Sequence, residues 1–215
     1  QSYITSRNAP IYVGGPAPIT HFPYSLTVED HRPVWLIDPY GNGYIIPDAK
    51  GLRVHKAQQT SRSHTGDRTT QGNFAAAWID HGTAPTDGRY AYVVLPQTSP
   101  DEVETYVKTP QVEIVRHDGR AHVVRHLPSR SIGYAVFDET LELTAGAFRK
   151  ASQPVLVYEK YDGDVLTFSI ADPDLRLLKF PNQSMSERQA WQAGAEASLR
   201  VELNGQWTLA GDGDN

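Results

Sequence analysis

The sequence predicts an antiparallel, all-β protein built as a β-sandwich. Short segments with alternating apolar and polar residues recur along its 215 residues, and clusters of glycine, proline, asparagine and aspartate separate them. Asp-Gly or Asn-Gly pairs stand between several of these segments, as is typical of two strands joined by a tight turn. Only one stretch carries strong helix signals, so helices form a minor part of the predicted fold.

Three strands are predicted in the first half of the chain, over residues 52–58, 74–79 and 89–95. In the third strand, Tyr90 and Tyr92 fall on one face because side chains alternate along a strand. We expect the segments around Trp78 and Tyr92 to pair as neighbouring strands of one broad sheet.

Three hairpins are predicted in the second half, because Asp-Gly and Asn-Gly supply the positive φ angles that tight turns need. Their turns are Asp118-Gly119, Asp162-Gly163 and Asn204-Gly205. The first joins residues 112–116 to 122–126, the second joins the strands around Tyr158 and Val165, and the third joins residues 201–203 to 206–208.

Helix signals are strongest at Ser99, Pro100 and Glu102, which form a capping box with proline at the first helical position. They predict a short crossover helix over residues 101–108. Residues 185–197 are a second candidate helix, although this segment contains Gly194 and has weak amphipathic spacing.

A composition shift over residues 140–154 marks a candidate boundary between two domains. We expect residues 1–145 to form a central β-sandwich that is incomplete at its N-terminal end, and residues 146–215 to begin a smaller β-domain, itself a candidate second sandwich. The chain begins with neither methionine nor a leader and ends after half of an expected hairpin, which suggests a piece of a longer protein.

Charge and composition exclude several classes of function. The formal charge is -5, from 20 basic and 25 acidic residues, so general attraction to nucleic acid is not expected, and an acidic polysaccharide would need a local basic groove. The absence of cysteine excludes disulfides, thiolate catalysis and cysteine-ligated zinc. No apolar run of about 18 residues is present, so a membrane is not an expected partner.

The most informative sequence motifs are Trp78-Ile79-Asp80-His81-Gly82, then Ala84-Pro85, then Tyr90-Ala91-Tyr92-Val93-Val94-Leu95-Pro96. In this order they are similar to the central sheet of polysaccharide lyase family 8, and most of all to its chondroitinase ABC type. Trp35-Leu36-Ile37-Asp38 and Gln71-Gly72-Asn73-Phe74 also resemble that type. The resemblance extends over about residues 1–203.

The resemblance implies an enzyme part that acts on glycosaminoglycans containing uronate, such as chondroitin sulfate, dermatan sulfate or hyaluronan, by β-elimination. In that family, asparagine, histidine, tyrosine and arginine of a preceding helical toroid neutralise the carboxylate and transfer the protons. Nothing in this chain matches the toroid, and a glutamate that the chondroitinase ABC type uses would precede Gln1.

We therefore expect no catalytic residue and no cofactor in this chain. The expected partners are an acidic polysaccharide and a helical catalytic domain outside the chain, and the location implied by the resemblance is secreted or periplasmic.

Candidate substrate-binding residues lie in the polar loop of residues 60–70, which is flanked by strands. Arg62, His64 and Arg68 are the predicted contacts to the polysaccharide, since function often lies on a loop held by a rigid scaffold. The alternative is a plain hairpin tip. A basic stripe formed by Arg116, Arg120, Arg125 and Arg130 is a further candidate, and its alternative is a solvated face neutralised by nearby carboxylates.

Histidines offer weaker candidates. His122 and His126 would stand roughly 13 Å apart on a strand, which disfavours a zinc site. His81 is either a catalytic or groove residue or a side chain that fixes the turn after the Trp78 strand together with Asp80. For the whole chain, the rival functions are a stand-alone carbohydrate-binding module, which saturable binding of glycosaminoglycan oligosaccharides by the chain alone would favour, and a scaffold that binds nothing.

Overall fold

The computed structural model describes residues 2–4, 10–173 and 199–209. Its antiparallel sheets and single short helix confirm the predicted nearly all-β fold. The chain divides into two compact units, residues 1–110 and 111–215, which we call unit 1 and unit 2. The sequence-based domains of residues 1–145 and 146–215 stay a prediction, and the candidate helix over residues 185–197 lies outside the described residues.

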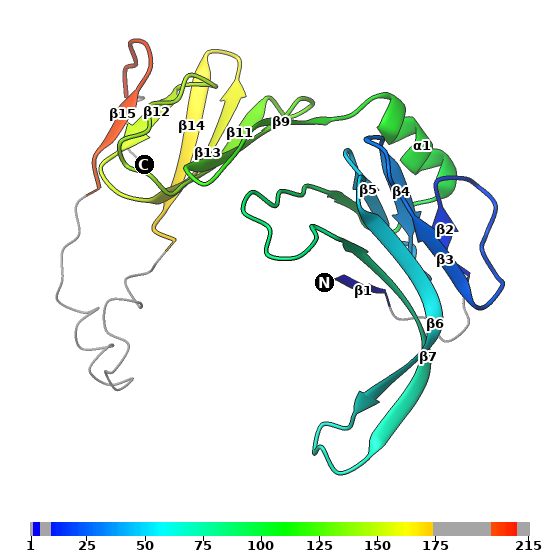
Figure 1. Ribbon diagram of the computed structural model, residues 1–215. Helices are drawn as coiled ribbons and strands as arrows, with labels where there is room; N and C mark the ends of the chain where they lie inside the picture. Colours follow the sequence, from blue (N-terminus) through cyan, green and yellow to red (C-terminus); the bar gives the residue numbers. More distant parts are fainter. Residues whose placement is uncertain (1, 5–9, 174–198, 210–215) are drawn as a thin grey trace. The chain divides into compact units, whose positions relative to one another are not determined.

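Unit 1 is a sandwich of two four-stranded sheets (Figure 1). The first sheet has the order β1 (Ser2–Ile4), β7 (Thr69–Ile79), β6 (Leu52–Arg62) and β3 (Tyr24–Thr27). The second has the order β2 (Tyr12–Val13), β4 (Val34–Ile37), β5 (Gly43–Ile46) and β8 (Val93–Leu95). Val34, Leu36 and Ile46 of the second sheet share one core with Val54 and Ala77 of the first.

Helix α1 (Pro100–Lys108) covers the other face of the second sheet (Figure 1). It begins as predicted: the Ser99 hydroxyl accepts from the Glu102 amide, and the Ser99 amide donates to the Glu102 carboxylate at 2.8 Å. Val103 packs into a core with Trp35 and Ile45, so β4 is buried on both faces. Apolar residues therefore follow one another along β4 without alternation.

The segment between β7 and β8 differs from the prediction. Residues 80–92 contain no strand, and β8 covers only Val93–Leu95 instead of residues 89–95. The expectation that the segments around Trp78 and Tyr92 pair in one sheet is wrong, because β7 and β8 belong to different sheets. Residues 80–92 carry the chain from one layer of the sandwich to the other, and we call them the crossover.

Unit 2 contains a five-stranded antiparallel sheet and a strand pair. The sheet has the order β14 (Val165–Ala171), β13 (Val155–Asp162), β11 (Ser131–Val136), β10 (Ala121–His126) and β9 (Val112–His117). The pair consists of β12 (Phe148–Ala151) and β15 (Val201–Leu203). Phe148 and Ala151 pack with Val123, Tyr134 and Val157 of the sheet, so the pair covers one of its faces.

Two of the three predicted hairpins are present, and their turns are stabilised in different ways. Gly163 has φ +58°, as a tight turn requires. In the turn between β9 and β10, the Asp118 carboxylate instead accepts the amides of Arg120 and Ala121 at 2.8 and 3.0 Å, and the chain turns around that carboxylate.

The third predicted hairpin is wrong. Residues 206–208 form no strand, and β15 pairs with β12. Asn204 is occupied elsewhere, because its side-chain amide donates to the carbonyls of Leu143 and Gly146 at 3.0 Å each. None of the helices within the described residues has the length and apolar character needed to cross a bilayer.

Candidate functional site

The first candidate site is the outer part of the hairpin formed by β6 and β7. Within the described residues, β3 pairs only with residues 53–56 of β6 and β1 pairs only with residues 75–77 of β7. Residues 57–74 therefore extend beyond the sheet as a two-stranded ribbon, roughly 20 Å long at six residue pairs, and we call them the hairpin arm (Figure 1).

Local hydrogen bonds order the tip of the hairpin arm. The Ser63 hydroxyl donates to the Asp67 carboxylate at 2.7 Å, the Thr65 hydroxyl donates to the same oxygen, and the Ser63 amide donates to the Arg68 carbonyl at 2.8 Å. Hydrogen bonds from Thr65 and Ser63 lower the pKa of Asp67, so this carboxylate is ionised at neutral pH. The Asp67 carboxylate therefore serves as the acceptor for hydroxyl groups within the turn.

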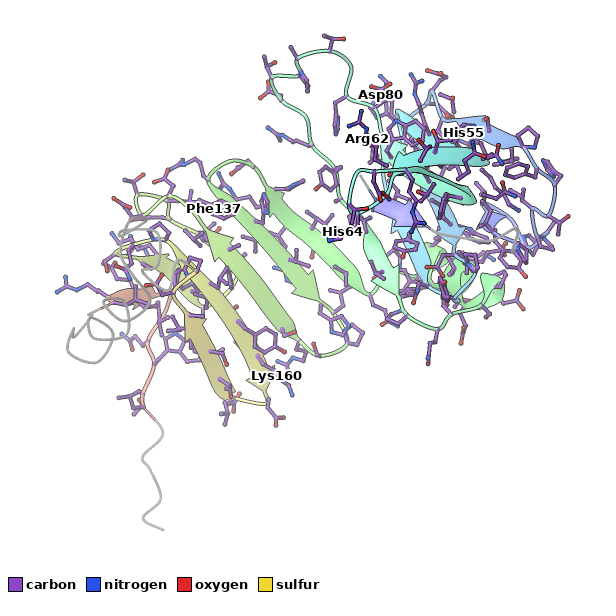
Figure 2. All side chains as sticks on the ribbon, turned by 90° about the horizontal axis from the view of Figure 1, so that it is seen from below. His55, Arg62, His64, Asp80, Phe137 and Lys160 are labelled. Carbon is purple, nitrogen blue, oxygen red and sulfur yellow. The ribbon has the colours of Figure 1, made fainter. Side chains whose placement is uncertain are left out.

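Arg62, His64 and Arg68 are all exposed on this arm, which points toward the viewer in Figure 2. Among the residues that the structure describes, none is a recorded hydrogen-bond or ion-pair partner for the ends of these three side chains. The arm therefore presents two guanidinium groups that remain available to an anionic ligand.

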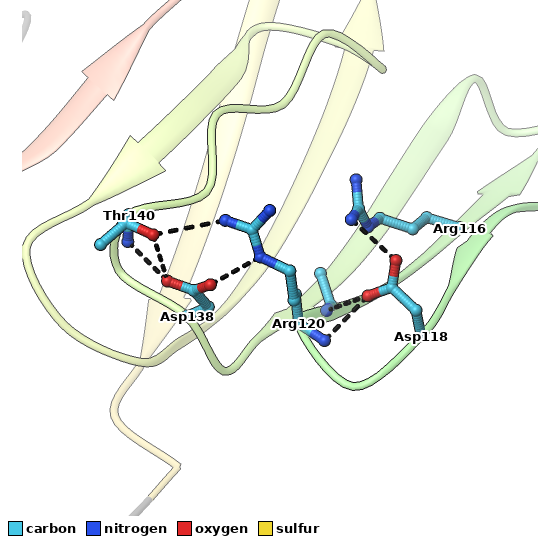
Figure 3. A network of polar contacts seen from close by, with 6 residues as sticks. Arg116, Asp118, Arg120, Asp138 and Thr140 are labelled. Atoms are coloured by element: carbon cyan, nitrogen blue, oxygen red, sulfur yellow. Dashed lines mark hydrogen bonds and ion pairs between the residues drawn. The ribbon is translucent and has the colours of Figure 1, made fainter. Parts of the chain in front are cut away.

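The basic stripe predicted in unit 2 has a different environment (Figure 3). Arg116 pairs with Asp118 at 2.7 Å, Arg120 pairs with Asp138 at 2.6 Å, and Arg125 pairs with Glu113 at 2.6 Å. Three of the four arginines thus lie on a solvated sheet face and are neutralised by neighbouring carboxylates, while the Arg130 side chain has no recorded partner among the described residues. The stripe is therefore a weaker candidate for an anion site than the hairpin arm.

The same network predicts a specific pH dependence of stability. Arg116, then the Arg120 amide, hold the pKa of Asp118 at about 2, and Thr140, then the Arg120 side chain, hold the pKa of Asp138 at about 2, both from an ordinary value of 3.8. Because the folded state binds these protons less readily than the unfolded state, the stabilisation is complete above pH 3.8 and is lost as the pH falls toward 2.

We expect the double variant Asp118→Asn with Asp138→Asn to be less stable than the native chain at neutral pH and equally stable near pH 2. Urea unfolding across that range measures the difference. Glu139→Gln is the matched control, because Glu139 is exposed and has no recorded polar partner within the described residues. A stability gap that persists unchanged at low pH would contradict the assignment.

The second candidate site is an open cavity of about 330 Å³ at one end of the sandwich of unit 1, which we call the rim pocket. Its deep part is apolar and comes from both sheets: Leu36, Ile46, Leu52, Ala77 and Ile79. Its exposed rim consists of His81, Tyr90 and Tyr92 from the crossover. Pockets of this size and lining are typical of small-molecule sites, whose volumes begin at roughly 300 Å³.

Aromatic side chains of the crossover lie close to one another at the rim. The Tyr90 and Tyr92 rings are nearly parallel, with an interplanar angle of 10° and centroids 6.3 Å apart, and the His81 ring lies 6.4 Å from Tyr90. Asp80 fixes the preceding turn by accepting the Gly82 amide at 2.9 Å and pairing with Arg53 at 2.7 Å. The alternative that His81 also fixes this turn is not supported, since no hydrogen bond between the His81 ring and the turn is recorded among the described residues.

Tyr44 lines the rim pocket, and its hydroxyl is bound to a buried carboxylate. This hydroxyl donates to the buried Asp38 carboxylate at 3.3 Å, which also accepts the amides of Tyr40 and Asn42 at 2.8 and 2.9 Å. Burial, and then the Asp38 charge, raise the pKa of Tyr44. The hydroxyl therefore stays protonated.

The histidines of unit 2 form aromatic contacts. The rings of His117 and His122 lie 4.6 Å apart, and His122 packs edge-on against Phe137 at 5.2 Å. Among the described residues, no three His, Asp or Glu side chains are grouped closely enough to hold a metal ion.

Comparison with known proteins places this geometry in a family. Residues 3–107 match the model of the polysaccharide lyase family 8 super-sandwich domain. The chain contains a super-sandwich domain of polysaccharide lyase family 8. Both candidate sites, the hairpin arm and the rim pocket, lie within the matched residues of this family 8 domain.

Relatives extend the similarity beyond the family 8 domain. A chondroitin sulfate ABC endolyase of Proteus vulgaris is 28% identical over 98% of this chain and 20% of its own length. A chondroitin sulfate ABC exolyase of the same organism is 32% identical over 66% of this chain and 14% of its own length. The chain therefore spans at most about a fifth of these relatives. A Paenibacillus xanthan lyase structure shares the fold, with a TM-score of 0.66 and 23% identity over 80% of this chain and 18% of that one.

The two sites of the family 8 domain are not brought together. Residues 69–79 of β7 separate the arm tip from the crossover, which places them roughly 30 Å apart along the strand. Loop length and polarity indicated Arg62, His64 and Arg68. The rim pocket was missed, although the sequence did place Tyr90 and Tyr92 on one face, because no sequence pattern indicated that they border a cavity between two sheets.

Proposed function

We propose that this chain is part of a polysaccharide lyase that cleaves uronate-containing glycosaminoglycans, such as chondroitin sulfate, dermatan sulfate or hyaluronan, by β-elimination. Its role is to support a helical catalytic domain and to form part of the substrate cleft. The observation that carries the proposal is the family 8 domain itself, whose relatives are chondroitin sulfate lyases about five times as long as this chain.

The proposal assigns the elimination chemistry to residues outside this chain. A lyase of this type has to neutralise the uronate carboxylate, remove the adjacent proton and protonate the leaving oxygen. We also propose that the enzyme is secreted or periplasmic. A long charged polysaccharide does not cross a membrane unaided, so its lyase meets it outside the cytoplasm.

Turnover measurements test the assignment of catalysis. We expect the chain alone to release no unsaturated product from chondroitin sulfate or hyaluronan, as followed by ultraviolet absorbance. A longer protein that adds the residues encoded directly upstream of Gln1 is expected to release it. High turnover by the chain alone would contradict the proposal, and so would an upstream reading frame that encodes no helix-rich domain.

The hairpin arm is the proposed contact to the anionic polymer. Each guanidinium group of Arg62 and Arg68 can form paired hydrogen bonds to a carboxylate or sulfate, and neither has a recorded partner among the described residues. His64 lies between them in the sequence of the tip, and its exposed ring offers a further hydrogen-bonding group.

Replacing Arg62 and Arg68 together with alanine is expected to weaken the binding of a hyaluronan or chondroitin sulfate oligosaccharide by about tenfold, and to reduce its dependence on salt. Titration calorimetry at two salt concentrations measures both effects. Arg32→Ala is the matched control, because it also removes an exposed charge from unit 1 but at the surface pair with Asp30. Equal weakening by the control would indicate a general charge effect.

A further inference from the structure

Two tyrosines in the crossover are unusually exposed. Tyr90 and Tyr92 are 60% and 47% accessible, and neither belongs to a strand. Their rings are nearly parallel and both border the rim pocket. Exposed aromatic rings held in a fixed mutual geometry beside a cavity are a common feature of binding surfaces.

The charge of the rim pocket selects among possible ligands. Its lining contains no lysine, arginine, aspartate or glutamate. A carboxylate or sulfate group placed in the apolar interior would lose its water without gaining a cation, which is strongly unfavourable. The pocket is therefore suited to an uncharged ligand with an apolar part.

One component of a glycosaminoglycan meets this requirement. The polymer alternates a charged uronate with an N-acetylhexosamine, which is neutral in hyaluronan and carries sulfate only on its hydroxyls in chondroitin sulfate and dermatan sulfate. In each polymer its ring has apolar C–H faces, and its uncharged acetamido group ends in a methyl. The C–H faces suit the tyrosine rings at the rim, and the methyl suits the apolar interior formed by Leu36, Ile46 and Leu52. The His81 ring at the rim can exchange hydrogen bonds with sugar hydroxyls.

We propose that the rim pocket is a subsite for the N-acetylhexosamine of the polysaccharide, with Tyr90 and Tyr92 against the sugar ring and the acetamido methyl directed into the cavity. This inference rests on the proposed function, since it concerns the same polymer. The two sites would then bind complementary parts of the polymer: the hairpin arm binds charged groups, and the rim pocket binds the uncharged acetamido side of the hexosamine.

Two matched trisaccharides test the subsite. Triacetylchitotriose and cellotriose share a β-1,4 backbone, but only the first carries acetamido groups. In NMR titrations of the labelled chain, we expect triacetylchitotriose to shift the resonances of His81, Tyr90 and Tyr92, and cellotriose to bind at least about tenfold more weakly. Equal affinity for the two sugars, or no shift at these residues, would overturn the proposal.

Variants separate this site from other aromatic surfaces. Tyr90→Ala and Tyr92→Ala are each expected to weaken triacetylchitotriose binding by about tenfold. Tyr40→Ala is the matched control, because Tyr40 is 72% exposed in the same unit and does not line the pocket. All three tyrosines are exposed, so each variant is expected to fold, and circular dichroism tests that expectation. An equal effect of Tyr40→Ala would overturn the assignment.

A hyaluronan tetrasaccharide distinguishes the two proposals from each other. Binding that depends on Arg62 and Arg68 but not on Tyr90 would support the proposed function and overturn the subsite. Binding of triacetylchitotriose at the rim pocket without any binding of hyaluronan, chondroitin sulfate or dermatan sulfate oligosaccharides would support a hexosamine site and contradict the proposed polymer. Dependence on both sets of residues would support both proposals.

Discussion

Replacing Glu159 with alanine is expected to lower the free energy of unfolding of unit 2 by about 3 kcal/mol, because its carboxylate organises a buried loop. Glu159 is fully buried on β13. It accepts the Phe148 amide at 2.9 Å and the Ala147 amide at 3.3 Å. These bonds hold the start of β12 against the five-stranded sheet, where Phe148 is part of the core.

The atoms around Glu159 are packed too closely for another group to replace its carboxylate as a hydrogen-bond acceptor. A Cβ atom on Gly146 would overlap a carboxylate oxygen of Glu159, so the loop backbone passes directly over the carboxylate. Alanine at position 159 would leave the Phe148 amide buried without this acceptor and would open a cavity in the same place. Glu159→Gln keeps the shape but turns one acceptor into a donor, and an intermediate loss is expected.

Urea unfolding measures the change in stability, and hydrogen exchange at the Phe148 amide gives a local readout. In Glu159→Ala this amide is expected to lose most of its protection, whereas amides in the middle of β11 change only as far as global stability does. Glu139→Ala is the control, since an exposed carboxylate of the same unit should cost less than about 0.5 kcal/mol. Unchanged protection at Phe148 would contradict the proposed role.

Features set by neighbours in sequence were predictable. The capping box at Ser99 and Glu102 and the turn at Asp162-Gly163 depend on residues within a few positions of one another, so the sequence located α1 and the β13–β14 hairpin. The polar loop that ends in the hairpin arm was predictable for the same reason. Its protrusion was not, because that depends on how far β1 and β3 extend along β7 and β6.

Features set by distant residues were not predictable. Alternation around Tyr90 and Tyr92 indicated a shared face but could not reveal that the chain changes sheets there. Asn204 bonds carbonyls near residue 145 instead of completing a hairpin. Lys56 is another example: it points into the sandwich, where its ammonium group donates to the Ile19 carbonyl at 3.1 Å and burial lowers its pKa. Each depends on partners far away along the chain.

The second large effect is expected at Gly51, in the turn that joins β5 to β6. Gly51 has φ +79°, and a Cβ atom there would lie 2.7 Å from the Asp80 carbonyl oxygen. Its own carbonyl accepts the Asp80 amide at 2.9 Å, and its amide donates to the Val28 carbonyl at 2.8 Å. The turn therefore lies against the backbone at which β7 ends and the crossover begins.

Gly41→Ala separates the cost of a positive φ angle from the cost of a close contact at the new Cβ atom. Gly41 has nearly the same φ, +80°, but a Cβ atom there would meet its neighbours no closer than 3.7 Å, which is ordinary contact. We expect Gly41→Ala to lower the free energy of unfolding of unit 1 by about 1 kcal/mol, the cost of a side chain in the left-handed region. Gly51→Ala is expected to cost about 3 kcal/mol, because the backbone of Asp80 also has to move.

The consequence of Gly51→Ala extends to the rim pocket. Displacing Asp80 moves the residue next to His81 and strains the Arg53 pair that holds the turn. We therefore expect Gly51→Ala, but not Gly41→Ala, to shift the His81 and Tyr90 resonances in the absence of any ligand. Equal losses of stability for the two variants would show that φ alone matters at Gly51. The close backbone contact would then have no part in setting the geometry of the rim.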